Sequence, residues 1–229
     1  DSQNSLFKQI SLSEIPNLIE RSQFNKRRKS LFLFSEQIRT KLASQFLRFE
    51  DYFIVDSMPL EICKFSRHNR IKICKDDFET APSKGFCASQ NSWFFGYKLH
   101  GVCSVTGVFH SLDITKAEVH DVHFLKNIKQ QMSDCILLGD RGYLSDSIQI
   151  DLFQSANIKL ETPKRINQMN YKPQPYIFKK SRKRIETLFS QLCDQFLIRR
   201  NYAKTFEGFK TRILAKITAL TLVQYINKF

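Results

Sequence analysis

The spacing of apolar residues predicts helices at the start of the chain. Between residues 11 and 49, apolar side chains recur at helical intervals, with Ser11 or Ser13 available as a cap and Pro16 near an early turn. The basic run 26–29 interrupts this pattern. We therefore expect two helices, one on each side of the basic run.

A short apolar run predicts the first buried strand. Residues 52–55 are uniformly apolar, and Asp56 and Pro59 follow them. Such a run is typical of a strand that is covered on both faces, although its length alone does not exclude a helix. Residues 60–91 are polar and irregular, so we expect a loop or an insertion there.

Alternating polarity predicts a hairpin next. Residues 93–105 alternate, with Trp93 on one face and with Lys98 and His100 on the other. After a Thr-Gly turn, residues 108–114 form the expected partner strand. We expect Trp93 and most of the phenylalanines to lie in the core and not to act as surfaces for stacking bases.

The remaining pattern alternates strands and helices. It predicts, in order, a helix at 120–132, a strand at 135–138, a helix at 144–156, a strand at 158–160, a loop at 161–178, a helix at 181–198 and a helix at 205–226 with Thr205 as its cap. Strands with a hairpin, followed by strand-helix alternation and closing helices, predict a mixed α/β fold with a central sheet and flanking helices.

Composition excludes several classes of protein. The 229 residues are 42% apolar and include 21 Phe, which is enough for a buried core. We expect neither a membrane helix nor a secretory signal, because no stretch has the required apolar pattern. The six cysteines are scattered without a C-x-x-C pair, which is typical of reduced thiols, so we expect a cytoplasmic protein.

Positive charge is concentrated in the last third of the chain. The sequence has 36 Lys and Arg against 22 Asp and Glu, a net charge of +14. Residues 159–229 carry 16 basic and 4 acidic side chains, whereas residues 51–158 carry 11 and 13. A near-neutral middle followed by a basic end is typical of a protein that holds a polyanion beside an acidic site.

Three carboxylates have unusual surroundings. Asp56 and Asp140 each follow an apolar run, and Glu186 lies among basic residues on an apolar-striped helix. A carboxylate at the end of a buried strand is costly unless it is paired or binds a cation. Neighbouring strands with the helix packed over them would bring the acids together at a site for hard divalent cations such as Mg²⁺. Two such ions, about 4 Å apart, can promote attack on a phosphodiester.

Each acid also has a simpler explanation when it is taken alone. Asp56 precedes a Ser-Met-Pro turn, and Asp140 could cap a turn or pair with Arg141. Glu186 lies four residues after Arg182, a spacing that is common in surface ion pairs. Spacing alone therefore leaves both interpretations open.

Five short blocks carry a resemblance to a known family. They are FIVDSMPL (53–60), FGYKLH (95–100), ITKAEVHD (114–121), LGDRGY (138–143) and RKRIET (182–187). In this order they resemble the DDE transposases of bacterial insertion sequences, and most closely the insertion sequence 982 family. Many relatives have a Tyr and a Lys where this chain has Lys179 and Cys193, whereas Arg182 and Glu186 of the same signature are present.

The resemblance implies a ribonuclease-H-like fold and a metal-dependent site. It assigns Asp56, Asp140 and Glu186 as the catalytic and metal-binding triad, with two Mg²⁺ ions, or Mn²⁺ in their place. It also implies a catalytic domain at 51–229, with basic C-terminal helices, after an N-terminal helical segment at 1–50. We expect that segment to be part of a truncated DNA-binding region.

The activity that this family implies is the cutting and joining of double-stranded DNA. The substrates would be the terminal inverted repeats of the element and a target DNA, the enzyme would be a homo-oligomer of at least two subunits, and it would act on DNA in the bacterial cytoplasm. Two other classes stay open: an inactive or domesticated DNA-binding protein derived from a transposase, and a ribonuclease-H-like nuclease that does not join strands.

Basic side chains near the predicted triad are candidate contacts to the DNA backbone. The candidates are Lys98, His100, Arg141, Lys179, Lys180, Arg182, Lys183 and Arg184. We expect the strand face that carries Lys98 and His100 to lie near Asp56, if their strand neighbours the first one.

Three further residues have the spacing or chemistry of ligands. His120 and His123 could bind zinc, but no Cys or acid completes a zinc pattern, so we expect them at the start of a helix. Asp121 could be a fourth acid near the site, although a helix cap is the simpler interpretation.

Overall fold

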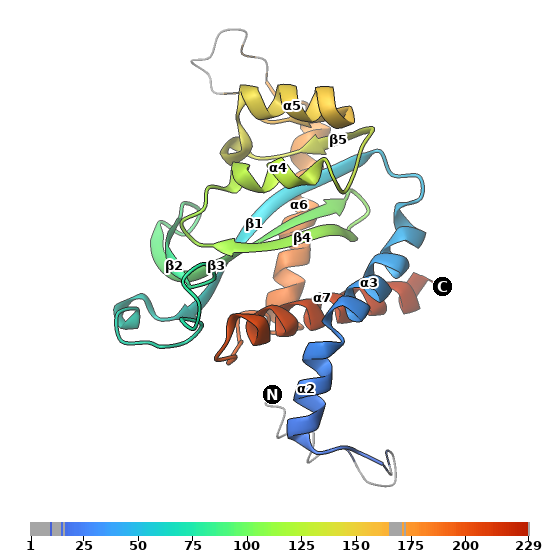
Figure 1. Cartoon of the computed structure of the whole chain (residues 1–229). Helices are drawn as coiled ribbons and strands as arrows, with labels where there is room; N and C mark the ends of the chain where they lie inside the picture. The colour runs from blue at the N-terminus through green and yellow to red at the C-terminus, as the bar shows by residue number, and fades with distance from the viewer. Residues whose placement is uncertain (1–9, 11–14, 16, 165–170, 172, 229) are drawn as a thin grey trace.

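A single mixed sheet, with helices on both faces, forms the centre of the molecule (Figure 1). This arrangement comes from a computed structural model that describes residues 10, 15, 17–164, 171 and 173–228. The strands are β1 (Tyr52–Cys63), β2 (Ser83–Cys87), β3 (Ser92–Ser104), β4 (Phe109–Lys116), β5 (Cys135–Leu138) and β6 (Ile158–Glu161). The α-helices are α2 (Arg21–Ser30), α3 (Phe32–Leu47), α4 (Leu125–Ile128), α5 (Asp146–Ala156), α6 (Tyr176–Asp194) and α7 (Phe206–Lys228). Short 3-10 helices are η1 (Phe65–Arg67), η2 (Asp121–Phe124) and η3 (Arg141–Tyr143).

The strand order confirms the ribonuclease-H-like fold. The sheet has the order β2-β3-β1-β5-β6, and β4 also pairs with β3. The pairs of β1, β3 and β4 are antiparallel, whereas β5 is parallel to β1 and β6 is parallel to β5. A meander of antiparallel strands that continues into two parallel strands, with helices in the connections, defines this fold. The predicted mixed α/β class is therefore correct.

β1 is longer than the sequence pattern predicted. Its predicted end at Asp56 is wrong, because β3 pairs with β1 along its whole length as far as Cys63. On the other edge of β1, β5 pairs only with residues 52–54, so β5 does not cover that edge after residue 54. Proline lacks an N–H group and is tolerated on such an edge, which explains why Pro59 lies inside the strand.

The predicted loop at 60–91 also contains a short strand. β2 pairs with the first residues of β3, from the register pair Ser83 and Gly96 to the pair Cys87 and Ser92. Gly85 is required at its centre, since a Cβ there would lie 2.7 Å from the Ala117 carbonyl oxygen. Five residues with a central glycine show too little alternation to be recognised from the sequence.

The helix boundaries differ from the prediction at three places. The basic run 26–29 does not separate two helices; it lies in the last turns of α2, where positive charge is favourable at a helix C-terminus. The break lies at Leu31. The helix expected at 120–132 is limited to η2 and α4, and α6 begins at Tyr176. The proposed caps and early turn before residue 17 lie outside the described residues.

Two apolar clusters hold the helices against the sheet. Alternate residues of β1, such as Ile54 and Met58, belong to the cluster beneath α6 and α7, whereas Phe53 and Val55 belong to the cluster with α4 and α5. The predicted stripe of α6 is confirmed, because its apolar residues are buried in the first cluster. Each fully buried aliphatic side chain contributes about 1.5–3 kcal/mol of transfer free energy.

Trp93 contradicts the prediction that it lies in the core. Its side chain is 59% exposed at the start of β3, where the sheet extends beyond the layer of helices. Most phenylalanines of the central strands are buried, as expected. Among the described helices, none has the length and apolar character needed to cross a membrane.

Candidate active site

The register of the parallel strands brings two predicted acids together. Ile54 of β1 pairs with Leu138 of β5, and each predicted acid, Asp56 or Asp140, lies two residues further along its own chain. Paired residues of parallel strands are about 4.8 Å apart and point to the same face. Asp140 accordingly raises the pKa of Asp56 by charge repulsion.

Backbone N–H groups orient both carboxylates. The Ser57 N–H donates a hydrogen bond to Asp56 Oδ1 at 2.8 Å. The Gly142 N–H donates to Asp140 Oδ1, also at 2.8 Å, and this bond begins η3. Glycine is favoured at position 142 of the D-R-G-Y sequence, because a Cβ there would lie 3.0 Å from Asp140 Oδ1. Both acids are therefore held in place by the chain that immediately follows them.

Burial dominates the electrostatics of Asp56. The pKa of Asp56 is raised to about 7, chiefly by loss of solvent and also by the nearby charges of Asp140 and Asp121. The Ser57 N–H and the Arg182 guanidinium act in the opposite direction and lower it. A carboxyl group with these neighbours would be stabilised in its charged form by a cation.

α6 passes over β1 at the level of Asp56. Gly101 of β3 is the register partner of Asp56, and a Cβ on Gly101 would lie 3.6 Å from the Phe189 ring. Ile185 packs into the same cluster as Ile54. Glu186 lies between these two contacts, one helical turn after Arg182 and on the same side of the helix. Its carboxylate is exposed.

The three predicted acids do not form a completed metal cluster. Within the described residues, no group of three or more His, Cys, Asp or Glu side chains could hold a metal ion, and His120 and His123 are in no such group. Asp56 and Asp140 nevertheless fit a hard divalent cation, because they are adjacent oxygen donors whose charges repel. Glu186 lies on α6, the helix that packs against β1.

Asp121 has a role that the sequence did not reveal. It makes no cap hydrogen bond for η2. Its Oδ1 atom accepts a hydrogen bond from Ser57 Oγ at 3.0 Å and forms an ion pair with Lys98 Nζ at 3.0 Å. Asp121 therefore connects β3 to the residue that follows Asp56. A signal for this role was absent from the sequence, because Ser57, Lys98 and Asp121 lie on β1, β3 and η2 and meet only in the folded structure.

Lys98 and His100 lie on the opposite face of the sheet from Asp56. They share one strand face, as predicted, but it is the face of Val102 and Val55 and not the face of Ile54 and Asp56. The expected proximity to Asp56 on one face is therefore wrong, because adjacent residues of a strand point to opposite faces.

The His100 ring has no exposed surface for contact with a phosphate. His100 is 0% exposed, its Nε2 lies 2.7 Å from Thr115 Oγ1, and its ring stacks on Phe124 at 5.1 Å. Lys98 Nζ already bonds to Asp121 and to the Val119 carbonyl. These two residues belong to the structure beneath the site.

Tyr143 is a further residue near the acids that sequence reasoning missed. It follows Asp140 at the end of η3 and is 1% exposed. Burial raises the pKa of Tyr143 well above its ordinary value, and the charges of Asp56, Asp121 and Asp140 raise it further. Its ring packs in the apolar cluster with α4 and α5, close enough to feel the charges of all three aspartates.

The first turns of α6 present a basic surface. Lys179, Lys180, Lys183 and Arg184 are exposed, Arg182 is partly buried, and Arg141 is exposed on η3. The Arg184 side chain lies over Gly107, where a Cβ would lie 2.8 Å from Arg184 Cδ. Gly107 also has a positive φ of 95°, so both the backbone conformation and the close approach of Arg184 favour glycine at this turn. The basic side chains surround the helix position that carries Glu186.

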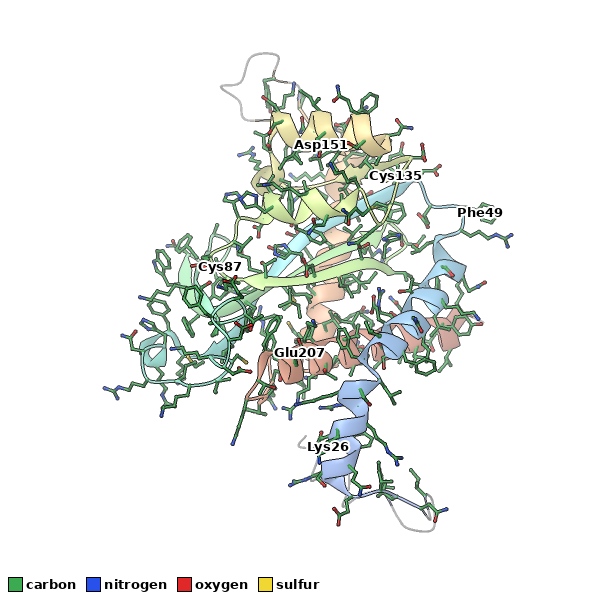
Figure 2. The ribbon with its side chains drawn as sticks, viewed as in Figure 1. Lys26, Phe49, Cys87, Cys135, Asp151 and Glu207 are labelled. Atoms are coloured by element: carbon green, nitrogen blue, oxygen red, sulfur yellow. The ribbon has the colours of Figure 1, made fainter. Side chains whose placement is uncertain are left out.

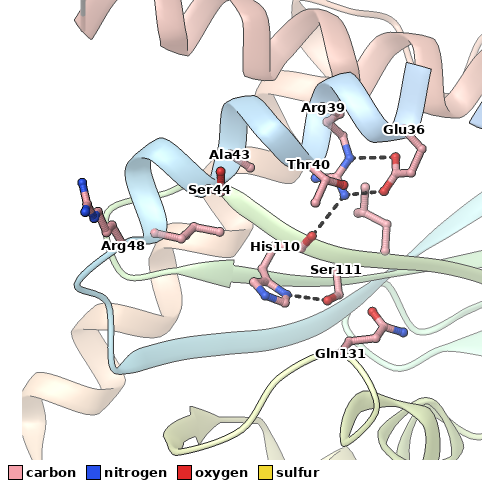
Figure 3. Close-up of a pocket in the computed structure, with 11 residues that line it drawn as sticks. Glu36, Arg39, Thr40, Ala43, Ser44, Arg48, His110, Ser111 and Gln131 are labelled. Carbon is pink, nitrogen blue, oxygen red and sulfur yellow. Dashed lines mark hydrogen bonds and ion pairs between the residues drawn. The ribbon is translucent and has the colours of Figure 1, made fainter. Parts of the chain in front are cut away.

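A separate hollow of about 470 Å³ lies between α3 and β4 (Figure 3). Arg39 lies at its wall, 1% exposed, with an ion pair to Glu36 and a hydrogen bond from Nη1 to the Phe109 carbonyl at 2.9 Å. No predicted catalytic residue lines this hollow. Arg39 joins α3 to β4 here through the carbonyls of Phe109 and His110.

Comparisons with known proteins identify a similar family. The model described as "Transposase DDE domain" matches residues 48–222. A comparison with curated proteins finds no match. Two solved structures are similar at 12% identity and a TM-score of 0.27: "Mos1 transposase paired-end complex with left transposon end" (99% of this chain, 70% of that chain) and "Crystal structure of the Mos1 mariner paired end complex with Mn" (93% and 64%).

Proposed function

Because the chain belongs to the transposase DDE domain family, whose members cleave DNA, we propose that Asp56, Asp140 and Glu186 are its catalytic and metal-binding acids. The matched segment, 48–222, contains all three. The observation that carries the proposal is the pairing of β1 with β5, which supports a common site for Asp56 and Asp140. The position of Glu186 on α6, one turn from Arg182, supports its inclusion.

Asp56, Asp140 and Glu186 would hold the divalent cations. We propose Mg²⁺, two ions in the active complex, with Mn²⁺ able to replace it, because all donors are carboxylate oxygens. When bound, the cations would supply charge stabilisation at the phosphate and at the attacking and leaving oxygens. The Ser57 and Gly142 N–H groups support this role by orienting the aspartates before DNA arrives.

The basic surface of α6 is suited to hold the DNA backbone. Lys179, Lys180, Lys183 and Arg184 are exposed beside Glu186, and Arg141 is exposed beside Asp140. Contacts of this type fix the position of the duplex and carry no sequence information. We propose that Arg182, whose charge lowers the pKa of Asp56, also contacts the phosphate backbone.

The five sequence blocks also support proposals on the insertion-sequence family, the host, the DNA substrates and the oligomer. We propose membership of the insertion sequence 982 family, a bacterial host with action in its cytoplasm, terminal repeats and target DNA as substrates, and at least a dimer on DNA. We also propose a boundary near residue 50 between a helical segment and the catalytic domain. Arg39 supports a firm attachment of that segment, because it binds the carbonyls of Phe109 and His110 across the boundary.

Cleavage of element-end DNA tests the triad. The substrate is duplex DNA from both sides of this reading frame, which would contain the ends of the element. We expect Asp56→Asn, Asp140→Asn and Glu186→Gln each to reduce Mg²⁺-dependent cleavage by at least ~100-fold, with DNA binding retained.

Two conservative variants serve as matched controls for lost charge. Asp146→Asn and Glu207→Gln each remove an exposed carboxylate outside the proposed triad, and we expect full cleavage from both. Full cleavage by any triad variant would remove that residue from the site. Cleavage without Mg²⁺ or Mn²⁺ would refute the metal proposal.

A further inference from the structure

A cluster of aromatic rings lies at the end of the sheet that carries β2. Its members are Phe65, His68, Phe86, Trp93 and Phe95, which we call the aromatic platform. Trp93 is 59% exposed and Phe86 is 45% exposed, although both lie on strands of the central sheet. Large aromatic surfaces in water are unfavourable unless a partner covers them, so the platform requires an explanation.

The rings of the platform form one continuous chain of contacts. Phe86 and Trp93 are 5.4 Å apart between centroids, and Trp93 and Phe65 are 6.5 Å apart. Phe65 stacks on His68 at 4.9 Å with an angle of 19°, and His68 lies 5.6 Å from Phe95. The exposed rings of Phe86 and Trp93 are therefore in contact with each other, and Trp93 is linked through Phe65 to the more buried rings.

Strand pairing explains why the rings share one face. Phe86 is the register partner of Trp93, and Lys84 is the register partner of Phe95. Residues two apart on a strand point to the same side, so all four lie on one face of the β2–β3 ladder. η1 adds Phe65 to this face (Figure 1, where β2 and β3 are labelled).

Positive charge accompanies the rings. Lys84 Nζ lies 6.0 Å from the centre of the Phe65 ring, and Lys75 Nζ lies 5.5 Å from the centre of the Phe95 ring. Lys64 and Arg67, which flank Phe65 in the chain, are exposed. Exposed aromatic rings interleaved with Lys and Arg are the combination with which proteins bind single-stranded nucleic acid, by stacking bases and neutralising phosphates.

We propose that the aromatic platform binds unpaired bases of DNA, by stacking them on Trp93 and Phe86. The platform is distinct from the proposed metal site: Trp93 lies eight residues along β3 from Gly101, the partner of Asp56, or about 26 Å at a rise of about 3.3 Å per residue. Separated strands near a cut end would supply such bases. The choice of DNA as the nucleic acid rests on the proposed function, whereas the stacking does not depend on cleavage.

The fluorescence of Trp93 reports directly on stacking, because it is the one tryptophan in the sequence. The probe is an oligo-dT of about 20 nucleotides, added in the presence of EDTA so that no cleavage occurs. We expect saturable quenching by oligo-dT and much weaker quenching by a blunt duplex of the same length. Unchanged fluorescence while oligo-dT binds, or equal quenching by the duplex, would overturn the proposal.

Variants of the platform test the same contact by affinity. We expect Trp93→Ala to weaken binding of fluorescein-labelled oligo-dT about 10-fold in anisotropy titrations, and Phe86→Ala to weaken it while keeping the tryptophan reporter. Phe49→Ala is the matched control, since Phe49 is 89% exposed and lies far from the β2 end marked by Cys87 (Figure 2). Equal affinity of the platform variants and the control would overturn the proposal.

The binding and cleavage experiments fail independently of each other. If Trp93→Ala does not fold, quenching in the wild-type protein and the Phe86→Ala titration still decide the matter. Quenching by oligo-dT without any cleavage of element-end DNA would refute the proposed catalysis and leave the platform. Cleavage without quenching would refute the platform alone.

Discussion

Asp56 shows how one residue depends on neighbours from several parts of the chain. Its pKa is raised first by burial and then by Asp140 and Asp121, whereas the Ser57 N–H and Arg182 lower it. A side chain in this position is unstable as an isolated charge and is well suited to a cation.

Removing Asp121 should reveal its connection with Lys98. We expect Asp121→Asn and Lys98→Met each to lower the free energy of unfolding by about 1–3 kcal/mol, because each breaks the ion pair and leaves one partly buried partner without an opposite charge. Urea unfolding of the double variant should show a loss smaller than the sum of the two. Additive losses would show that the two side chains are not coupled.

His100 should make the protein less stable in mild acid. Burial lowers the pKa of His100 to about 4, below the value of about 6.5 that it has in an unfolded chain. Between these values the unfolded state binds the extra proton, so the free energy of unfolding falls as pH falls, by up to about 3 kcal/mol.

Unfolding by urea at several pH values measures this effect. Replacement of the ring by His100→Gln should flatten the dependence on pH between about 6.5 and 4, whatever the variant's stability at neutral pH. His123→Gln, which changes an exposed histidine, is the control. An unaltered slope in His100→Gln would contradict the assignment.

Some helix and strand boundaries could be predicted from local sequence signals, whereas others were determined by pairing between strands. β5 was predicted with its observed ends, and β3, β4 and α5 within a residue or two, because apolar runs, alternation and turn residues lie within each segment. β1 and β2 were misjudged because their extent depends on β3. The candidate pair Asp56 and Asp140 could be predicted from the apolar runs that precede them, whereas the contacts of Asp121 and Tyr143 required the three-dimensional arrangement.

The cap of α7 is a local signal that the structure confirms. The Gly208 N–H donates to Thr205 Oγ1 at 3.2 Å, and the Phe209 N–H donates to the Thr205 carbonyl at 2.9 Å. We expect Thr205→Ala to lower the free energy of unfolding by about 1 kcal/mol and Thr205→Ser to preserve it, as measured by urea unfolding. Equal losses in both variants would show that the hydroxyl is not the cap.

At the scale of the whole molecule, the distribution of charge matches the distribution of proposed tasks. The net charge of +14 is concentrated after residue 158, and α6 carries its densest exposed part. The proposed acids lie at the junction between the near-neutral sheet and this basic helix. The sequence alone predicted a polyanion beside an acidic site, but the fold was needed to show that α6 crosses the sheet there.

Neutralising the basic surface of α6 should weaken DNA binding equally for all sequences. We expect the combined replacement of Lys179, Lys180, Lys183 and Arg184 by Gln to reduce the slope of log K against log salt by up to about 3–4, because each phosphate contact contributes about 0.9. Lys126→Gln, on the opposite face of the sheet, should leave the slope unchanged. An unchanged slope in the fourfold variant would place the DNA elsewhere.

Joining of a pre-cleaved DNA end to a target DNA tests the central claim most directly. The substrate is an element-end duplex with a free 3′-hydroxyl, incubated with a plasmid and Mg²⁺. We expect the wild-type protein to produce joined DNA and Asp140→Asn to produce at least ~100-fold less while it binds the duplex as well as the wild type. Wild-type levels of joining by Asp140→Asn, or no joining by the wild-type protein, would contradict a transposase centred on these acids.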